Sequence, residues 1–426
     1  MLRFNDNNEV LREDRYNAII AGVQRDEDIE YSMEELARLV EAAGASVLGQ
    51  MVQKMEKPNT ATLIGKGKVE ELAELVKSME ADMVVFNDEL TGMQLRNLED
   101  SIGVRVIDRP ILILDIFASR ATSREGKLQV ELAQLKYRLP RLIGFGKSLS
   151  RLGGGIGTRG PGEKKLETDR RHIERRMNDI REEIAHLKST RSVQRAKREK
   201  SSIPVVALVG YTNSGKSALM NRLLSETKKE EKSVFEKNML FATLDVQQRS
   251  VTLESGRQFI LIDTVGFVSK LPHSLIEAFK ATLEEVTYAD LLLHVVDASY
   301  ENHDFHINVT DKVMEEIGAG AKEKIMVYNK TDLPHSEIIP VRGCDSIEIS
   351  AKYGNNIDKL IEKIEEKIFG DYVSASFLIP YERGDLSSYL CSEAEVKKMD
   401  YRENGTYFET VLKEADYRRL KCYEIV

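Results

Sequence analysis

The sequence has few of the residues that build disulfide-linked or membrane-embedded proteins. It contains three cysteines, nine prolines and no tryptophan among 426 residues. Cys344, Cys391 and Cys422 are too widely spaced for a metal site and odd in number for a disulfide framework. A membrane-spanning helix needs about 18 consecutive apolar residues, and no apolar run is that long. The polar N-terminus is unlike a signal peptide. These absences predict a cytoplasmic protein without membrane insertion.

Alternating strand and helix patterns fill the first 120 residues. Apolar runs at 18–23, 46–51, 82–86 and 104–107 predict buried strands, and helical spacing predicts helices at 33–43 and 69–79. Ser32 with Glu35 three positions later predicts a capping box at the start of the first helix. Strands that alternate with helices predict a mostly parallel sheet.

Residues 119–200 are strongly basic, with 22 Lys and Arg against 10 Asp and Glu in a chain whose net charge is −8. Apolar residues recur at helical spacing from Leu128 to Leu142 and again from Leu166 to Leu187. The glycine-rich stretch 151–162 between them cannot be helical. The pattern predicts two antiparallel amphipathic helices with a glycine-rich tip, and we expect Pro140 to bend the first helix.

This hairpin has two interpretations. A solvated, charged helix pair is the common outcome for such sequences. Exposed backbone N–H groups beside arginines at the tip instead favour contact with RNA phosphates. The short sequence 65–68, which we expect to form a flexible basic loop, is a weaker candidate of the same kind. The candidate RNA-binding residues are Lys66, Lys68, Arg151, Gly154, Gly155 and Arg159.

The clearest chemistry lies in the pattern G-x-x-x-x-G-K-S, which follows the apolar run 205–209. Its glycines let backbone N–H groups surround phosphate oxygens, Lys216 reaches the β- and γ-phosphates, and Ser217 can bind Mg²⁺. This pattern between a strand and a helix predicts a P-loop. The candidate nucleotide-binding residues here are Gly210, Tyr211, Thr212, Asn213, Ser214, Gly215, Lys216 and Ser217.

A second pattern, D-x-x-G, ends the apolar run 259–262 with Asp263 and Gly266. We expect Asp263 to hold Mg²⁺ through water and the Gly266 N–H to meet the γ-phosphate. Thr243 is the candidate switch residue, which ligates Mg²⁺ only when a γ-phosphate is present; an ordinary strand or loop threonine is the alternative. The candidate catalytic residues are therefore Lys216, Thr243, Asp263 and Gly266, and the candidate Mg²⁺ ligands are Ser217, Thr243 and Asp263.

The base is predicted from N-K-x-D, which Asn329, Lys330 and Asp332 form after the apolar run 325–328. Asp332 can accept hydrogen bonds from guanine N1–H and the 2-amino group, and adenine offers neither donor. Backbone N–H groups of the sequence Ser350, Ala351 and Lys352 are expected to close the pocket over guanine O6. The order and spacing of all these motifs predict a GTPase G domain.

Two residues bear on the mechanism of hydrolysis. Phe267 follows D-x-x-G, where many GTPases have a glutamine that orients the attacking water. A phenyl ring cannot orient water, so hydrolysis must rely on another group, on backbone or on a partner. Asn213 in the P-loop suggests a K⁺ site that replaces an arginine finger, and an asparagine that merely suits its loop is the alternative.

Together these residues resemble the HflX family of GTPases over nearly the whole chain. The resemblance implies an N-terminal α/β domain (1–120), a basic helical hairpin (121–203), a P-loop G domain (204–370) and a small C-terminal α/β domain (371–426). The stretches that carry it are 64–72, 108–110, 115–118, 125–135, 154–163, 166–171, 241–245, 263–267 and 379–386.

The resemblance also implies a function on the ribosome. It implies that the protein binds GTP and GDP, and that it binds the large ribosomal subunit and its RNA. It also implies that ribosomes stimulate GTP hydrolysis and that the protein splits stalled ribosomes under stress. We expect a monomer. Two other hypotheses stay open, namely a GTPase for subunit assembly or RNA modification, and a nucleotide-gated RNA-binding module with negligible turnover. The complete set of Mg²⁺ ligands argues against the last.

Overall fold

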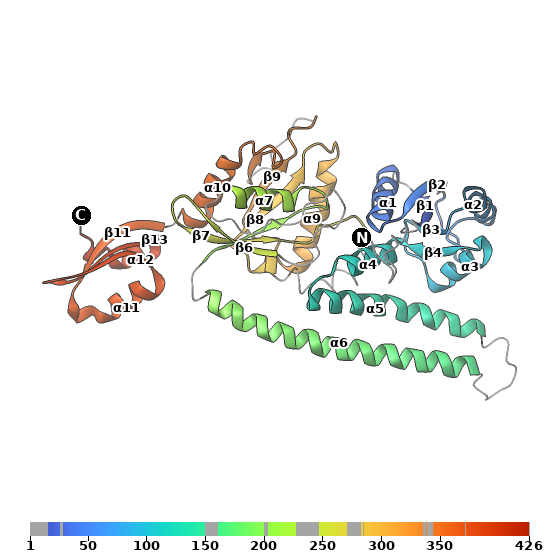
Figure 1. Ribbon diagram of the computed structural model, residues 1–426, viewed down its shortest axis with the longest axis horizontal. Coiled ribbons are helices and arrows are strands. Elements are labelled where there is room, and N and C mark those ends of the chain that lie inside the picture. The colour runs from blue at the N-terminus through green and yellow to red at the C-terminus, as the bar shows by residue number, and fades with distance from the viewer. Residues whose placement is uncertain are drawn as a thin grey trace, which may run out of the picture.

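The computed structural model describes residues 16–25, 29–149, 161–199, 203–226, 247–270, 283, 285–334, 338, 344–370 and 372–425. Arg151, Gly154, Gly155, Arg159 and Thr243 therefore lie outside the described residues. Within these ranges, no helix has both the length and the apolar character needed to cross a membrane. The molecule is elongated, with one sheet near each end and the largest sheet between them (Figure 1).

The N-terminal part is a parallel sheet in the order β2-β1-β3-β4, as the alternating pattern predicts. Helices α1, α4 and the start of α5 pack on one face, and α2 and α3 pack on the other. Both faces of β1 and β3 are therefore buried, which explains their continuous apolar runs. The elements are β1 (Asn17–Gln24), α1 (Glu30–Ala42), β2 (Ser46–Lys54), α2 (Lys66–Met79), β3 (Met83–Phe86), α3 (Gly92–Ile102), β4 (Arg105–Asp108) and α4 (Arg109–Arg120).

Two local predictions in this part are wrong. Helix α1 begins at Glu30 without a side-chain cap, because the Ser32 hydroxyl lies inside the first turn and donates to the buried Asn87 amide at 3.1 Å. The sequence 65–68 is not a flexible loop. Helix α2 begins at Lys66, and the Gly65 N–H that precedes it donates to Gln53 Oε1 at 2.8 Å.

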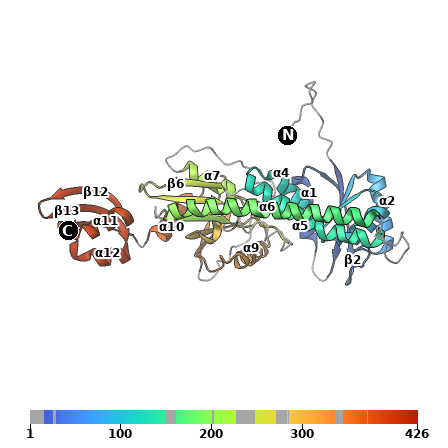
Figure 2. The same ribbon diagram turned by 90° about the horizontal axis from the view of Figure 1, so that it is seen from below.

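The basic region forms the predicted helical hairpin. Helices α5 (Arg124–Leu149) and α6 (Pro161–Glu199) run antiparallel, and α6 extends along both the N-terminal sheet and the central sheet (Figure 2). Pro140 lies inside α5, and the bend expected there stays a prediction. Among the described side chains, the apolar seam between the helices includes Leu128, Leu132, Leu135, Leu139, Ile173, Met177, Ile180, Ile184 and Leu187.

Helix α5 is fixed to the N-terminal sheet by a buried polar group. The Tyr137 hydroxyl donates to the carboxylate of Asp108, which also accepts from the backbone N–H of Leu90 at 2.9 Å. Arg141 covers the Tyr137 ring at 3.4 Å and donates to the Leu90 carbonyl at 2.6 Å. These contacts attach the middle of α5 directly to the N-terminal sheet.

The central sheet has the order β10-β9-β8-β5-β7-β6. Its strands are parallel except β6, an antiparallel edge strand that the sequence analysis did not predict. Helices α7 and α10 cover one face and α9 covers the other. The elements are β5 (Val205–Val209), α7 (Lys216–Ser225), β6 (Gln247–Thr252), β7 (Gln258–Asp263), β8 (Leu291–Asp297), α9 (His303–Ile317), β9 (Lys324–Asn329), β10 (Asp345–Glu348) and α10 (Ile357–Phe369).

The C-terminal part is a three-stranded antiparallel sheet in the order β11-β13-β12. Phe377 and Phe408 from the sheet pack with Leu390 and Leu420 from its helices. This arrangement completes the mixed α/β fold. The elements are β11 (Tyr372–Ile379), α11 (Gly384–Glu393), β12 (Glu395–Arg402), β13 (Gly405–Lys413) and α12 (Glu414–Leu420), with short 3₁₀ turns at Tyr381–Arg383 and Lys421–Tyr423.

Candidate nucleotide-binding site

The phosphate loop, residues 210–217, runs from the end of β5 into the first turn of α7. Gly210 and Gly215 have φ values of +148° and +94°, a region that L side chains rarely adopt. A Cβ on Gly210 would lie 2.2 Å from the Val295 carbonyl, and one on Gly215 would lie 2.2 Å from Asn329 Nδ2. Both glycines are therefore required by close approach as well as by backbone conformation. Asn213 has φ of +61°, a conformation that asparagine tolerates.

Lys216 is only 6% exposed, and its ammonium donates to the carbonyls of Gly210 at 3.0 Å and Tyr211 at 2.7 Å. Burial lowers the pKa of Lys216 to about 8, an effect that the nearby Asp263 carboxylate opposes. An anion bound beside it would favour the charged form. The site is therefore suited to a phosphate.

Two of the three candidate Mg²⁺ ligands lie together. The Ser217 hydroxyl donates to Asp263 Oδ2 at 2.7 Å, which joins the start of α7 to the end of β7. A hydroxyl and a carboxylate are the oxygen ligands that Mg²⁺ takes beside phosphates, so the donor set fits this ion. The third candidate, Thr243, lies outside the described residues.

The switch segment, residues 263–269, lies against the phosphate loop. The Thr212 N–H donates to the Phe267 carbonyl at 2.7 Å, and the Phe267 N–H donates to the Gly210 carbonyl at 3.2 Å. The Phe267 side chain is 2% exposed and packs in the core with Val286. This ring is therefore a core side chain, and the backbone of Phe267 hydrogen-bonds the phosphate loop.

The base-recognition motif is held together by Asn329. Its amide Nδ2 donates to the Ser214 carbonyl at 2.9 Å, and its Oδ1 accepts from the Ala351 N–H at 3.0 Å. The Ser350 hydroxyl donates to Asp332 Oδ1 at 2.6 Å. The structure thus brings the phosphate loop, N-K-x-D and the Ser350–Lys352 sequence to one edge of the central sheet, at the carboxyl ends of its parallel strands.

Sequence reasoning missed two residues that support this edge. Asp297, the last residue of β8, pairs with the Lys330 ammonium at 2.6 Å. Arg222 on α7 donates to the carbonyls of Ala351 at 3.1 Å and Lys352 at 2.8 Å. Asp297 ends an apolar strand as Asp263 does, and that signal could have identified it.

The candidate RNA-binding residues are only partly placed. Lys66 and Lys68 lie in the first turn of α2, where Lys68 pairs with Glu71 at 2.7 Å. Along the hairpin shaft, Arg170 pairs with Glu174 at 2.9 Å and Arg171 with Glu167 at 3.1 Å. These pairs favour the solvated interpretation for the shaft, whereas the tip lies outside the described residues.

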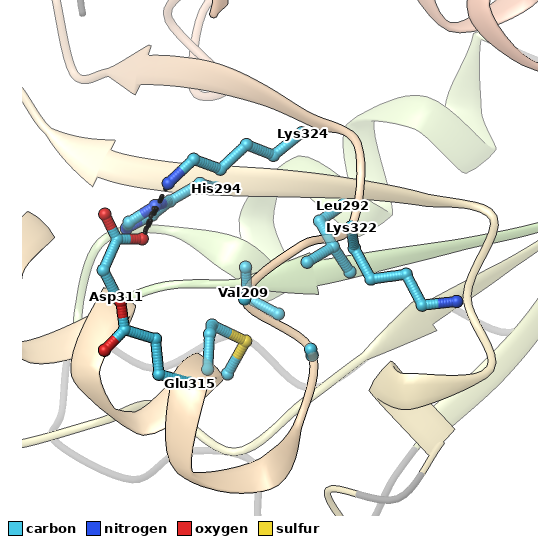
Figure 3. Close-up of a pocket in the computed structure, with 10 residues that line it drawn as sticks. Val209, Leu292, His294, Asp311, Glu315, Lys322 and Lys324 are labelled. Atoms are coloured by element: carbon cyan, nitrogen blue, oxygen red, sulfur yellow. Dashed lines mark hydrogen bonds and ion pairs between the residues drawn. The ribbon is translucent and has the colours of Figure 1, made fainter.

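A separate pocket of about 90 Å³ lies between α9 and strands β8 and β9 (Figure 3). His294 and Asp311 line it, and Asp311 accepts from Lys324 at 2.8 Å. Burial lowers the pKa of His294 to about 4, so this imidazole is neutral at pH 7. Pockets that bind ligands of nucleotide size measure about 300–1,000 Å³, so this cavity is not the nucleotide site.

Three family models match consecutive parts of the chain: "GTP-binding GTPase N-terminal" at residues 30–118, "GTP-binding GTPase Middle Region" at 120–198 and "50S ribosome-binding GTPase" at 205–330. The chain is 51% identical to GTPase HflX of Caldanaerobacter subterraneus, over 93% of this chain and 91% of that protein. The chain belongs to the HflX family. Like its relatives, this HflX-family protein is a GTP-hydrolysing enzyme whose substrate is GTP.

A second relative agrees with this assignment. The HflX-family chain is 38% identical to GTPase HflX of Escherichia coli, over 93% of each protein. Among solved structures, it is similar to a GTP-binding protein from Sulfolobus solfataricus in complex with GDP, with 24% identity and a TM-score of 0.45 over 83% of this chain and 98% of that one.

A Gly215→Ala substitution in this HflX-family protein should abolish tight nucleotide binding. The new methyl group would displace Asn329, which holds the base-recognition motif against the phosphate loop. We expect Kd for GDP to be at least about tenfold higher than backbone strain alone would make it. Gly256→Ala is the matched control, because Gly256 has φ of +86° with no atom within 4 Å of the new Cβ. Equal Kd values for the two variants, measured with a fluorescent GDP, would contradict this account.

Proposed function

We propose that this GTPase binds the large ribosomal subunit, is activated there, and splits stalled ribosomes under stress in the cytoplasm. The observation that carries the proposal is the burial of Phe267 at the position where many GTPases orient the attacking water. A GTPase site without a water-orienting side chain is expected to hydrolyse GTP slowly until a partner supplies the missing group. The match of residues 205–330 to a "50S ribosome-binding GTPase" supports the ribosome as that partner.

We assign the site residues the following roles. The phosphate loop holds the phosphates, Lys216 neutralises charge on the β- and γ-phosphates, and Gly266 contacts the γ-phosphate. Ser217, Thr243 and, through water, Asp263 would hold Mg²⁺, and the ion would supply positive charge that stabilises the negative charge developing during hydrolysis. Asp332 recognises guanine, with Lys330 along the base.

The four domains keep the boundaries 1–120, 121–203, 204–370 and 371–426, and the protein acts as a monomer.

We further propose that Asn213 takes part in binding a K⁺ ion. Its left-handed backbone conformation also suits an asparagine with no ligand. The rate of GTP hydrolysis in different salts distinguishes the two interpretations. GTP hydrolysis should be faster in K⁺ than in Na⁺ buffer if a monovalent cation replaces an arginine finger. Equal rates in the two buffers would remove this assignment.

The hairpin tip is the proposed contact with ribosomal RNA. Replacing Arg151 and Arg159 with alanine should weaken co-sedimentation with large subunits at least about tenfold, and lower the slope of log affinity against log salt by about 2. Arg170→Ala with Arg171→Ala is the matched control, because it removes the same charge from arginines that pair within the shaft. Equal losses in the two double variants would instead show a general charge effect of the helix pair.

A further inference from the structure

A buried carboxylate of the N-terminal part touches both sides of the nucleotide site. Glu35 on α1 and Arg109 at the start of α4 are 2% and 1% exposed and form an ion pair. The Glu35 carboxylate also accepts hydrogen bonds from the hydroxyl of Tyr211 in the phosphate loop and, at 2.5 Å, from the hydroxyl of Ser269 in the switch segment. One side chain outside the central sheet thus connects the phosphate loop and the switch segment.

Ser269 is held from several directions. Its backbone N–H donates to the Tyr211 hydroxyl oxygen at 2.7 Å. Arg109 Nη2 donates to its carbonyl at 3.1 Å and to its hydroxyl oxygen at 3.0 Å. In the same segment, Val265 and Val268 are buried in the hydrophobic core of the N-terminal part. The switch segment is therefore anchored to the N-terminal part by both polar and apolar contacts.

The ring of Tyr211 is fixed as well. It stacks on His306 of α9 at 3.9 Å, and His306 Nε2 hydrogen-bonds the Tyr31 hydroxyl of α1 at 2.6 Å. Figure 1 shows α1 beside the part of the central domain that carries α9. Burial raises the pKa of Tyr211, and the Glu35 carboxylate raises it further, so the hydroxyl remains a protonated donor. Tyr211 cannot move with the phosphate loop unless these contacts with the N-terminal part also change.

The anchored switch segment lies close to the phosphate-binding lysine. A Cβ on Gly266 would be 2.7 Å from Thr212 Cα and 3.0 Å from Lys216 Nζ. In a GTP complex, the γ-phosphate lies between the N–H of the switch glycine and the lysine ammonium. GTP therefore requires the switch segment to move away from Lys216, and GDP does not. The contacts to Ser269 oppose that movement.

We propose that Glu35 is a positioning residue which, together with Arg109, forms a latch on Ser269 and Tyr211 that disfavours GTP relative to GDP. The inference rests on the proposed roles of Lys216 and Gly266. Coupling between binding sites is reciprocal. A partner that binds the released state therefore raises the affinity for GTP, and GTP raises the affinity for that partner by the same factor. The latch thus links the N-terminal part to the choice of nucleotide.

The test uses the purified full-length protein without ribosomes. Kd is measured for a fluorescent GDP and for a non-hydrolysable GTP analogue in the wild type, in Glu35→Gln and in Glu34→Gln. Glu34 is the matched control, because it is the exposed neighbour of Glu35 and pairs with Arg38 in its own helix. In Glu35→Gln, the ratio of Kd for the GTP analogue to Kd for GDP should fall about fivefold or more, and in Glu34→Gln it should not change.

An unchanged ratio in Glu35→Gln, or a shift toward GDP, would overturn the latch. Glu35→Gln leaves the buried Arg109 without its anion, so the variant could fail to fold; circular dichroism would show this. Ser269→Ala then carries the test, since it removes a hydroxyl without leaving a charge unpaired, and the same direction of change is expected. A wild type that binds neither nucleotide would overturn the site assignment itself and the latch with it.

Discussion

An Asp332→Asn substitution is expected to change the preferred base of this GTPase from guanine to xanthine. The carboxylate of Asp332 can accept hydrogen bonds from guanine N1–H and the 2-amino group, and the Ser350 hydroxyl at 2.6 Å fixes its orientation. An asparagine amide would place an N–H donor against the 2-amino group of guanine. Xanthine carries an oxygen at that position and would accept from the same donor.

The size of the effect follows from replacing the hydrogen bond to the 2-amino group with two donors that face each other. We expect Kd for GDP to rise at least about a hundredfold and Kd for xanthosine diphosphate to fall below it. Asp297→Asn is the matched control, because Asp297 contacts Lys330 rather than the base edge. This substitution should weaken the binding of both nucleotides alike. An Asp332→Asn protein that still prefers GDP would contradict the assignment of the base site.

Removing the Lys216 side chain should lower the rate of GTP hydrolysis at least about a thousandfold, because a preorganised donor in a water-excluded site supplies several kcal/mol to the transition state. The measurement is single-turnover hydrolysis by Lys216→Ala with saturating GTP. Lys322→Ala is the control, since Lys322 lines the separate pocket beneath α9 and should leave the rate unchanged.

The same substitution should not destabilise the nucleotide-free protein. Burial lowers the pKa of Lys216 to about 8 from its ordinary value of 10.5, so the side chain stays mostly charged at pH 7 and that charged form is less stable in the folded than in the unfolded state. Replacing it with alanine relieves that cost, and the free energy of unfolding should stay equal or rise. A large loss of stability would mean that Lys216 is a structural residue, and the loss of hydrolysis could then not be assigned to phosphate binding.

The parts of the fold that depend on local pattern could be predicted from the sequence. Buried parallel strands produce continuous apolar runs, so β1, β3, β5 and β8 were recognisable, and the motif residues Asp263 and Asn329 mark the ends of such runs. The hairpin followed from the apolar spacing of its helices and the glycine-rich stretch between them. Strand β6 escaped prediction because an edge strand beside one neighbour has little apolar periodicity.

Contacts between distant segments could not be predicted in this way. Glu35 fits the local pattern of a capping box with Ser32, yet the structure uses it to bind Arg109, Tyr211 and Ser269. Those partners lie 74, 176 and 234 positions away in the sequence. The fold of the N-terminal part brings Arg109 to Glu35, and the docking of that part on the nucleotide site adds Tyr211 and Ser269. No local propensity reports either contact.

The most direct test of the ribosome-activated mechanism is the rate of GTP hydrolysis by the full-length protein in K⁺ buffer, with and without purified large ribosomal subunits. A buried Phe267 in place of a water-orienting side chain predicts a slow intrinsic rate and stimulation by the subunit on the order of tenfold or more. Measurable GTP binding with the same hydrolysis rate in both conditions would contradict the mechanism, and immature subunits and transfer RNA would then be the partners to examine.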